Sequence, residues 1–205
     1  MRFVNNVEDG VIEMRGVIGE FEDAIPANTF LDALQEHSGA DLVINLDSPG
    51  GSVSDGMAIY NAMMSYSGKI TVKIDTIAAS IASVIACAAD HVIINSNAQF
   101  MIHRAWTVAM GNSTDFRGLI EQLDVLDGMI ADVYVERTGA DKDTLMEMME
   151  AETFLSAEQA LEMGFADEVA YVKKERKEKK VKALALSPCV ISTQMKAKSL
   201  KMRLN

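Results

Sequence analysis

A serine lies inside an apolar run of small residues, DTIAASIASVIACAA, which covers residues 75–89. A buried hydroxyl without a hydrogen-bond partner costs about 1–3 kcal/mol, so Ser80 needs either a partner or a use. A serine in an alanine-rich helix often donates its hydroxyl to a carbonyl one turn earlier, and this structural interpretation stays open. The alternative is that Ser80 is the nucleophile of a covalent reaction.

A histidine that could serve as the base for such a nucleophile ends another apolar run, QFMIH at 99–103. Catalytic sites of α/β proteins are built from loops beyond the ends of strands, which is where His103 is expected. His103 could also be a histidine whose hydrogen bonds are satisfied at a strand end. His37 and His91 have no stronger claim, because one follows a predicted helix and the other stands before a predicted strand.

The third unusual stretch is the turn SPGG at 48–51, between a predicted strand and a predicted helix. Glycine permits backbone geometries that are closed to other residues, and bare N–H groups at a helix start can bind an anion. The turn could therefore be a phosphate cradle, an oxyanion hole or only a tight turn. Walker and Gly-x-Gly-x-x-Gly spacings are absent, which disfavours nucleotide binding. Together, Ser80, His103 and the backbone N–H groups of the Gly-Gly turn could supply the nucleophile, the base and the oxyanion hole of an acyl-transfer site.

Short β-branched runs alternate with helical patterns along the chain, which predicts an α/β domain with βαβ connections. The expected strands are residues 9–18, 40–46, 69–75, 90–95 and 98–103. The expected helices are residues 26–37, 54–66, 78–89, 113–138 and 141–150, with a last one from Ser156 to Gly164. In the longest helix Ser113 is the expected N-cap and Gly139 the expected stop.

Composition divides the chain at about residue 172. The net charge is −11, yet residues 173–205 hold eleven of the nineteen lysines and arginines and only two acids. We expect one domain at 1–172 followed by a basic, flexible tail at 173–205. The acidic body should repel nucleic acid. No apolar run is long enough for a membrane span, no signal peptide is evident, and two unpaired cysteines favour a reducing cytoplasm.

Four motifs in order, SPGG, AASIAS, MIH and FLSAEQALEMGFAD, make residues 10–172 resemble the Clp-type serine peptidases. The stretches GMAIYNAM, MIHRAWTVAMGNSTD and EAETFLSAEQALEMGFADEV are most similar to the Clp-like head-maturation (prohead) peptidases of tailed bacteriophages. The resemblance implies a spiral of ββα units shared with crotonases. It also implies that the helix at 113–138 is a projecting handle through which rings, usually of seven subunits, stack.

The same resemblance assigns roles to individual residues. It makes Ser80 the nucleophile, His103 the general base, and the backbone N–H groups of Gly51 and Ile81 the oxyanion hole. Glu152 takes the position of the third triad member, where the family usually has Asp. No metal or organic cofactor is implied. The implied substrates are proteins or peptides, with phage capsid or scaffold proteins as the specific expectation.

The sequence therefore predicts a cytoplasmic serine endopeptidase that works through an acyl-enzyme, either without ATP or assisted by an ATPase. The segment before SPGG is shorter than in the housekeeping enzyme, so docking of a Clp-type unfoldase ATPase stays open. One alternative is a crotonase-type acyl-CoA enzyme, which would not need a Ser–His pair. A second is a structural ring component whose site has decayed.

Overall fold

The computed structural model describes residues 2–20 and 22–171. Within them, eight strands and six helices follow one another along the chain. In chain order they are β1 (Arg2–Asn6), β2 (Val11–Arg15), α1 (Ala27–Glu36), β3 (Leu42–Ser48), α2 (Val53–Met64), β4 (Ile70–Ala79), α3 (Ile81–Cys87), β5 (His91–Asn95), β6 (Gln99–Ile102), α4 (Ser113–Thr138), α5 (Lys142–Glu150), β7 (Thr153–Ser156), α6 (Ala157–Glu162) and β8 (Glu168–Ala170).

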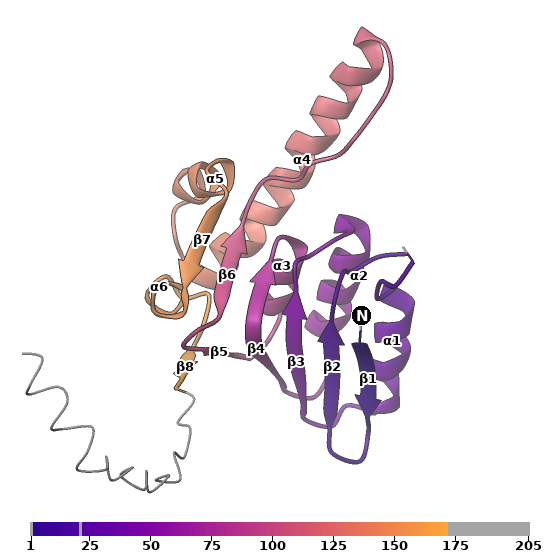
Figure 1. The fold of residues 1–205 in the computed structure, drawn as a ribbon, viewed down its shortest axis with the longest axis vertical. Helices are drawn as coiled ribbons and strands as arrows, with labels where there is room; N and C mark the ends of the chain where they lie inside the picture. Colours follow the sequence, from indigo (N-terminus) through magenta and orange to yellow (C-terminus); the bar gives the residue numbers. More distant parts are fainter. Residues whose placement is uncertain (1, 21, 172–205) are drawn as a thin grey trace, which may run out of the picture. The chain divides into compact units, whose positions relative to one another are not determined.

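The strands form a mixed sheet whose central part is parallel. Its order is β1-β2-β3-β4-β5-β8, with β6 pairing with the far end of β4 and β7 pairing antiparallel with β6. Each connection from β2 to β5 carries one helix, and α1, α2 and α3 lie together on one face of the sheet (Figure 1). This mixed α/β architecture confirms the expected fold class and is consistent with the expected spiral.

The core lies between the sheet and this helical layer. Along β3 the side chains alternate between buried and half-buried, as expected for a strand that is covered on one face. The buried Leu42, Ile44 and Leu46 belong to one apolar cluster with Phe30 of α1 and Ile59 of α2. The alternation of apolar residues along the strands therefore determines which face of the sheet packs against the helices.

Two boundaries differ from the sequence prediction at the candidate nucleophile. The run at 78–89 was expected to be helical throughout, but β4 continues to Ala79 and the helix α3 begins at Ile81. Ala78 and Ala79 pair with Phe100 and Met101 of β6, so the strand partner determines their conformation. Ser80 therefore lies at the turn between strand and helix, and not inside a helix.

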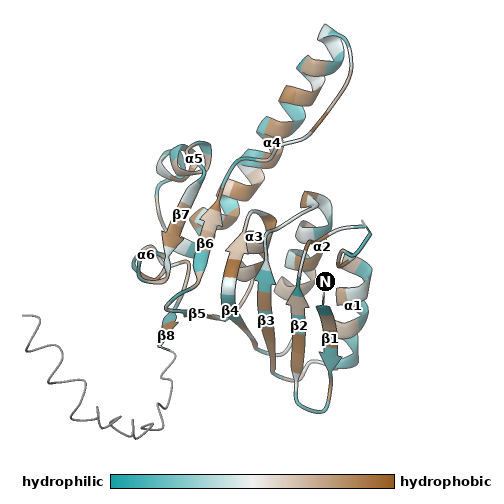
Figure 2. Ribbon diagram, viewed as in Figure 1, coloured by the Kyte–Doolittle hydropathy of each residue, from teal (hydrophilic) through white to brown (hydrophobic). Residues whose placement is uncertain are grey.

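The helix α4 extends beyond the rest of the fold, as expected for a handle (Figure 1). Its N-cap is Asn112 and not Ser113, because the Asn112 side chain accepts the backbone N–H groups of Thr114 and Asp115. Gly139 ends the helix in the left-handed conformation that favours glycine, with φ of 70°, as predicted. Hydrophobic and hydrophilic residues alternate along its projecting part (Figure 2).

The predicted basic tail lies outside the described residues, so its role stays a prediction. The structure divides into the units Met1–Val172 and Lys173–Asn205, and only the first is described here. None of the helices in the described residues combines the length and the apolarity that a membrane crossing requires.

Candidate active site

Ser80 occupies a strained turn at the C-terminal end of the central strand β4, directly before α3. Its φ of 56° and ψ of −131° place it in a region that non-glycine residues rarely adopt. Such a residue costs about 1–3 kcal/mol and persists where its surroundings hold it in place. Here the Ser80 N–H donates to the Met101 carbonyl at 3.0 Å, while the Ser80 carbonyl accepts the N–H of Ser83 at 2.9 Å. The surrounding hydrogen bonds therefore hold Ser80 in a strained conformation in which it stays partly accessible to solvent.

His103 reaches Ser80 because β6 pairs with β4. Ala79 is opposite Met101 in that pairing, and His103 follows Met101 by two residues at the strand end. The distance from His103 Nε2 to Ser80 Oγ is 2.7 Å, a hydrogen bond between a base and a hydroxyl. This is the geometry that proton transfer from the hydroxyl to the imidazole requires.

The two other histidines lie elsewhere. His37 is buried, and its Nε2 is 2.7 Å from Asn5 Oδ1. His91 begins β5 and lies within ion-pair distance of Asp167 and Glu168, at 3.7 and 3.6 Å. Of the three histidines, only His103 contacts a serine hydroxyl.

The SPGG turn runs beside Ser80 and needs both glycines. A Cβ on Gly50 would be 2.6 Å from the Cβ of Ser80, and a Cβ on Gly51 would be 1.9 Å from the carbonyl oxygen of Ile18. Both residues also have positive φ, 99° and 149°. Ser48 fixes the turn from inside, because its buried hydroxyl accepts the N–H of Gly50 at 3.0 Å.

The backbone of Gly51 is oriented by its pairing with Ile18. Ile18 pairs with this segment by donating its N–H to Gly50 and accepting the N–H of Ser52, at 2.9 and 2.8 Å. In such a parallel bridge the N–H of the middle residue points away from the partner strand, so that of Gly51 points to the opposite side from Ile18. Gly51, Ser80 and His103 line one cavity of about 610 Å³.

Glu152 lies next to the last residue pair of β6 and β7, without a hydrogen bond to His103. The antiparallel register of these strands ends at the pair Ile102–Thr153, and His103 and Glu152 are the residues immediately beyond that pair on the two segments. Glu152 is exposed, has a left-handed φ of 48° and follows the last residue of α5 by two positions. Among the described residues, no hydrogen bond or ion pair joins its carboxylate to the imidazole. The structure thus brings Ser80, His103 and Gly51 together and leaves Glu152 adjacent to them.

Comparison with known proteins is consistent with this geometry. The family model described as Clp protease matches residues 14–173. One similar relative is the ATP-dependent Clp protease proteolytic subunit of Ligilactobacillus salivarius (strain UCC118), 31% identical over 175 residues that cover 83% of this chain and 88% of the relative.

The chain belongs to the Clp protease family.

This membership makes it a serine-type peptidase and decides against the crotonase-type alternative for this chain. Within this Clp protease, Ser83 takes the structural role that the sequence left open for Ser80. Its buried hydroxyl donates to the Ser80 carbonyl three residues earlier, at 2.5 Å. The structural interpretation that stayed open for Ser80, a hydroxyl bonded to a carbonyl one turn earlier, therefore does not apply to Ser80, which precedes α3, and describes Ser83 instead.

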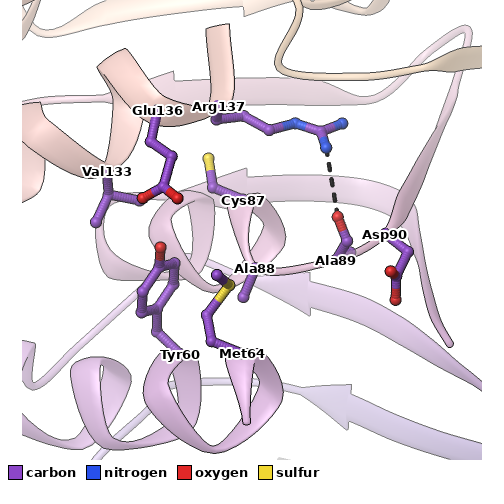
Figure 3. A pocket seen from close by; sticks show the side chains of 9 residues that line it. All are labelled: Tyr60, Met64, Cys87, Ala88, Ala89, Asp90, Val133, Glu136 and Arg137. Carbon is purple, nitrogen blue, oxygen red and sulfur yellow. Dashed lines mark hydrogen bonds between the residues drawn. The ribbon is translucent and has the colours of Figure 1, made fainter. Parts of the chain in front are cut away.

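Cys87 offers no rival nucleophile in this Clp protease. It lines a second pocket, of about 270 Å³, where its sulfur points towards α4 between Glu136 and Arg137 (Figure 3). Burial raises the pKa of its thiol to about 12, against a lowering effect of Arg137. Because the thiolate is the reactive form, this cysteine is inert at neutral pH.

The sequence analysis missed the polar residues that bind the segment next to His103 in this Clp protease. Arg104 directly follows His103 and donates to Asp127 of α4 and Glu150 of α5, both at 2.7 Å. These carboxylates, Glu150 first, raise the pKa of the Arg104 guanidinium. The available signal was an acid, Asp127, placed within the apolar stripe of a helix that was otherwise assigned to assembly.

Proposed function

We propose that this Clp protease is an endopeptidase that cleaves peptide bonds through an acyl-enzyme on Ser80. The observation that carries the proposal is the 2.7 Å contact between His103 Nε2 and Ser80 Oγ beside an open cavity. The experiment is hydrolysis of a fluorogenic peptide by the purified protein, with and without prior treatment by a fluorophosphonate. We expect turnover that the reagent abolishes; turnover that survives complete treatment would contradict the serine mechanism.

The proposed reaction uses the side chains and backbone groups already described. His103 Nε2 takes the hydroxyl proton as Ser80 Oγ attacks the substrate carbonyl, and it then gives that proton to the departing amine. The N–H groups of Gly51 and Ile81 donate to the oxyanion of the tetrahedral intermediate. Ile81 supports this role because it is the first residue of α3, where an N–H has no acceptor within the helix. Water, activated by His103, then hydrolyses the ester.

We propose Glu152 as the acid that orients His103, supported by its place directly before Thr153, which pairs with Ile102, the residue before His103. A triad acid holds the base in the correct tautomer and stabilises its charged form. Glu152→Gln keeps the shape and removes the charge, so it should lower the turnover number by at least about 10²-fold. Glu152→Asp should keep part of the activity. The measurement is hydrolysis of a small fluorogenic peptide by both variants.

Assembly must be verified for each Glu152 variant, because a lost ring would also lower turnover. Glu150→Gln is the matched control, since that neighbouring carboxylate pairs with Arg104 at 2.7 Å and not with His103. A smaller loss in Glu150→Gln than in Glu152→Gln supports the assignment. Wild-type turnover in fully assembled Glu152→Gln would leave a Ser80–His103 dyad as the mechanism.

The proposed substrates are polypeptides with an apolar side chain at the cleaved bond. The cavity around Ser80 is walled by apolar side chains from four parts of the chain, namely Val17, Pro49, Val53, Met101, Trp106 and Val108. Capsid or scaffold proteins of a phage are the more specific proposal. That proposal is supported by the similarity of the quoted motifs to phage head-maturation peptidases. The same similarity supports a location in the cytoplasm of the bacterial host.

We further propose that α4 mediates assembly into stacked rings. In the C-terminal half of this helix, called the inner half here, one side is buried at Ile130 and Tyr134. In the N-terminal, outer half the same side is uncovered. There, Phe116 and Ile120 are 43% and 58% exposed. An amphipathic stripe that continues beyond its own subunit is suited to a partner copy, and the resemblance suggests rings of seven.

Replacing Phe116 and Ile120 together with Asp should therefore lower the assembled mass while each subunit stays folded. Two charges in an apolar contact are costly to desolvate, whereas on a free helix surface they cost little. The measurements are light scattering for mass and circular dichroism for folding. Leu161→Asp is the matched control, because Leu161 is similarly exposed, at 41%, but on α6. A wild type that is monomeric at micromolar concentration would refute the proposal.

A further inference from the structure

Two polar side chains are buried in the inner half of α4, where its other buried residues are apolar. Asp127 is 2% exposed and Tyr134 is 1% exposed, while Ile130, Ala131 and Val133 between them are apolar. Seven residues are about two turns of helix, so Asp127 and Tyr134 lie on the same side. Buried polar groups need partners. Asp127 finds its partners next to His103, and Tyr134 finds its partner next to Ser80.

Asp127 binds the chain immediately after His103. Its Oδ2 accepts the Nε–H of Arg104 and its Oδ1 accepts the backbone N–H of Ala105, each at 2.7 Å. A carboxylate with both oxygens bonded, one of them to a guanidinium, is a strong and directional anchor. The Arg104 N–H is also held, by the Met149 carbonyl at 3.2 Å.

His103 is therefore fixed from both sides along the backbone. On one side Ile102 pairs with Thr153 in the sheet. On the other side, where the strand pairing ends, the hydrogen bonds of Arg104 and Ala105 to Asp127 hold the chain instead. With its neighbours fixed, the His103 backbone is held at the position from which the imidazole makes its 2.7 Å contact with Ser80.

Tyr134 acts on the other half of the pair. Its hydroxyl is 2.7 Å from Ser83 Oγ, and Ser83 Oγ donates to the Ser80 carbonyl. Since Ser83 has a single hydroxyl proton and gives it to Ser80, the Tyr134 hydroxyl must donate to Ser83. Tyr134 thus supports the carbonyl of the strained residue that carries the nucleophile.

We propose that the inner half of α4 is the positioning element of this active site, with Asp127 holding the segment of His103 and Tyr134 holding the turn of Ser80. Neither residue lines the cavity around Ser80, so both act through another residue. The inference rests on the proposed Ser80–His103 function. Its physical basis is that a displacement of about 1 Å between reacting groups can cost about 10²-fold in rate.

The test is steady-state hydrolysis of a fluorogenic peptide by the full-length, assembled protein. The rate is divided by the concentration of active sites, which is measured on a separate sample by complete labelling with a fluorophosphonate. Asp127→Asn keeps the volume but turns one acceptor into a donor that faces a donor. It should lower kcat by about tenfold or more and leave KM within about twofold. Tyr134→Phe deletes only a hydroxyl and should lower kcat by about threefold to tenfold, again without a change in KM.

Two matched controls separate positioning from general destabilisation. Asp132→Asn makes the same chemical change on the same helix, where the carboxylate is exposed and pairs with Lys142 at 2.6 Å. Tyr66→Phe removes a tyrosine hydroxyl that donates to the Ala40 carbonyl at 2.8 Å, far from the site. Both controls should keep the wild-type kcat per labelled site.

The outcomes distinguish this inference from the proposed function. A purely structural role would lower the thermal midpoint and the labelled fraction but would leave kcat per labelled site unchanged, which overturns the inference alone. If Asp127→Asn does not assemble, Tyr134→Phe still decides, because it preserves volume and apolar packing. A wild type that carries no label at Ser80 overturns both the function and the inference.

Discussion

Replacing Ser80 with alanine should abolish peptide hydrolysis, with a fall in the turnover number of at least about 10⁴-fold. In the proposed mechanism the hydroxyl oxygen forms the covalent bond to the substrate, and no other described serine near it is placed to do so. Ser83, which is three residues further along, is fully buried and its hydroxyl is engaged with the Ser80 carbonyl and Tyr134. The measurement is hydrolysis of a fluorogenic peptide by the purified variant.

The Ser80→Ala experiment needs a control for serine replacement in general. Ser65→Ala is suitable, because Ser65 is an exposed C-cap residue whose hydroxyl bonds to Asn61 in its own helix. It should retain wild-type turnover. The alanine variant of Ser80 should also remain folded, since alanine leaves the turn backbone and its hydrogen bonds unchanged. Hydrolysis by an intact Ser80→Ala protein at more than about a hundredth of the wild-type rate would reject Ser80 as the nucleophile.

Replacing His103 with alanine should have the second-largest effect, also about 10⁴-fold or more on the turnover number. Without the imidazole, the Ser80 hydroxyl keeps its proton and is a poor nucleophile at neutral pH. The double variant Ser80→Ala/His103→Ala should be hardly slower than either single variant, because the two side chains work as one unit. The measurement is the same hydrolysis assay on all three proteins.

His91→Ala is the matched control for the loss of a histidine. His91 lies on β5 beside Asp167 and Glu168, with 43% of its side chain exposed. Its replacement should leave turnover unchanged. Fully additive losses in the Ser80/His103 double variant would show that the two residues act separately, which would contradict the hydrogen-bonded pair.

The central residues of the site could be predicted from sequence because their spacing and types are unusual. A serine in a small-residue run, a histidine ending a strand and a Pro-Gly-Gly turn each had an ordinary explanation, and only their combination pointed to acyl transfer. The structure places Ser80, His103 and Gly51 around one cavity. The role of Glu152 as the third triad member stays a prediction: no hydrogen bond joins its carboxylate to the imidazole among the described residues, and the two residues lie just beyond the last pair of β6 and β7.

Element boundaries were harder to predict where tertiary pairing overrides local preference. Ala78 and Ala79 suit a helix as well as a strand, and their pairing with β6 decides for the strand. The sequence analysis did not predict β1, β7 or β8, which are short strands of three to five residues. Such strands carry too little periodic pattern to be recognised before their partners are known.

The anchors on α4 could not be predicted because the sequence does not show which residues face each other. Asp127 and Tyr134 lie on a helix that the sequence analysis assigned to assembly, and it gave neither residue a role in the site. Their roles depend on Arg104 and Ser83, which are 23 and 51 residues away along the chain. An acid at a position of a helix where its neighbours on the same face are apolar is the signal that a sequence can offer for such an anchor, because a buried carboxylate needs partners.

The most direct test of the central claim is to locate the adduct of a serine-directed fluorophosphonate on the folded wild-type protein by mass spectrometry. Trypsin should release residues 74–104, which contain Ser80, Ser83 and His103, as one peptide. Fragmentation between Ser80 and Ser83 then distinguishes the two serines. We predict a single adduct on Ser80 that is lost in the His103→Ala variant; an adduct on Ser83 or on another residue, or none on the folded protein, would contradict the account.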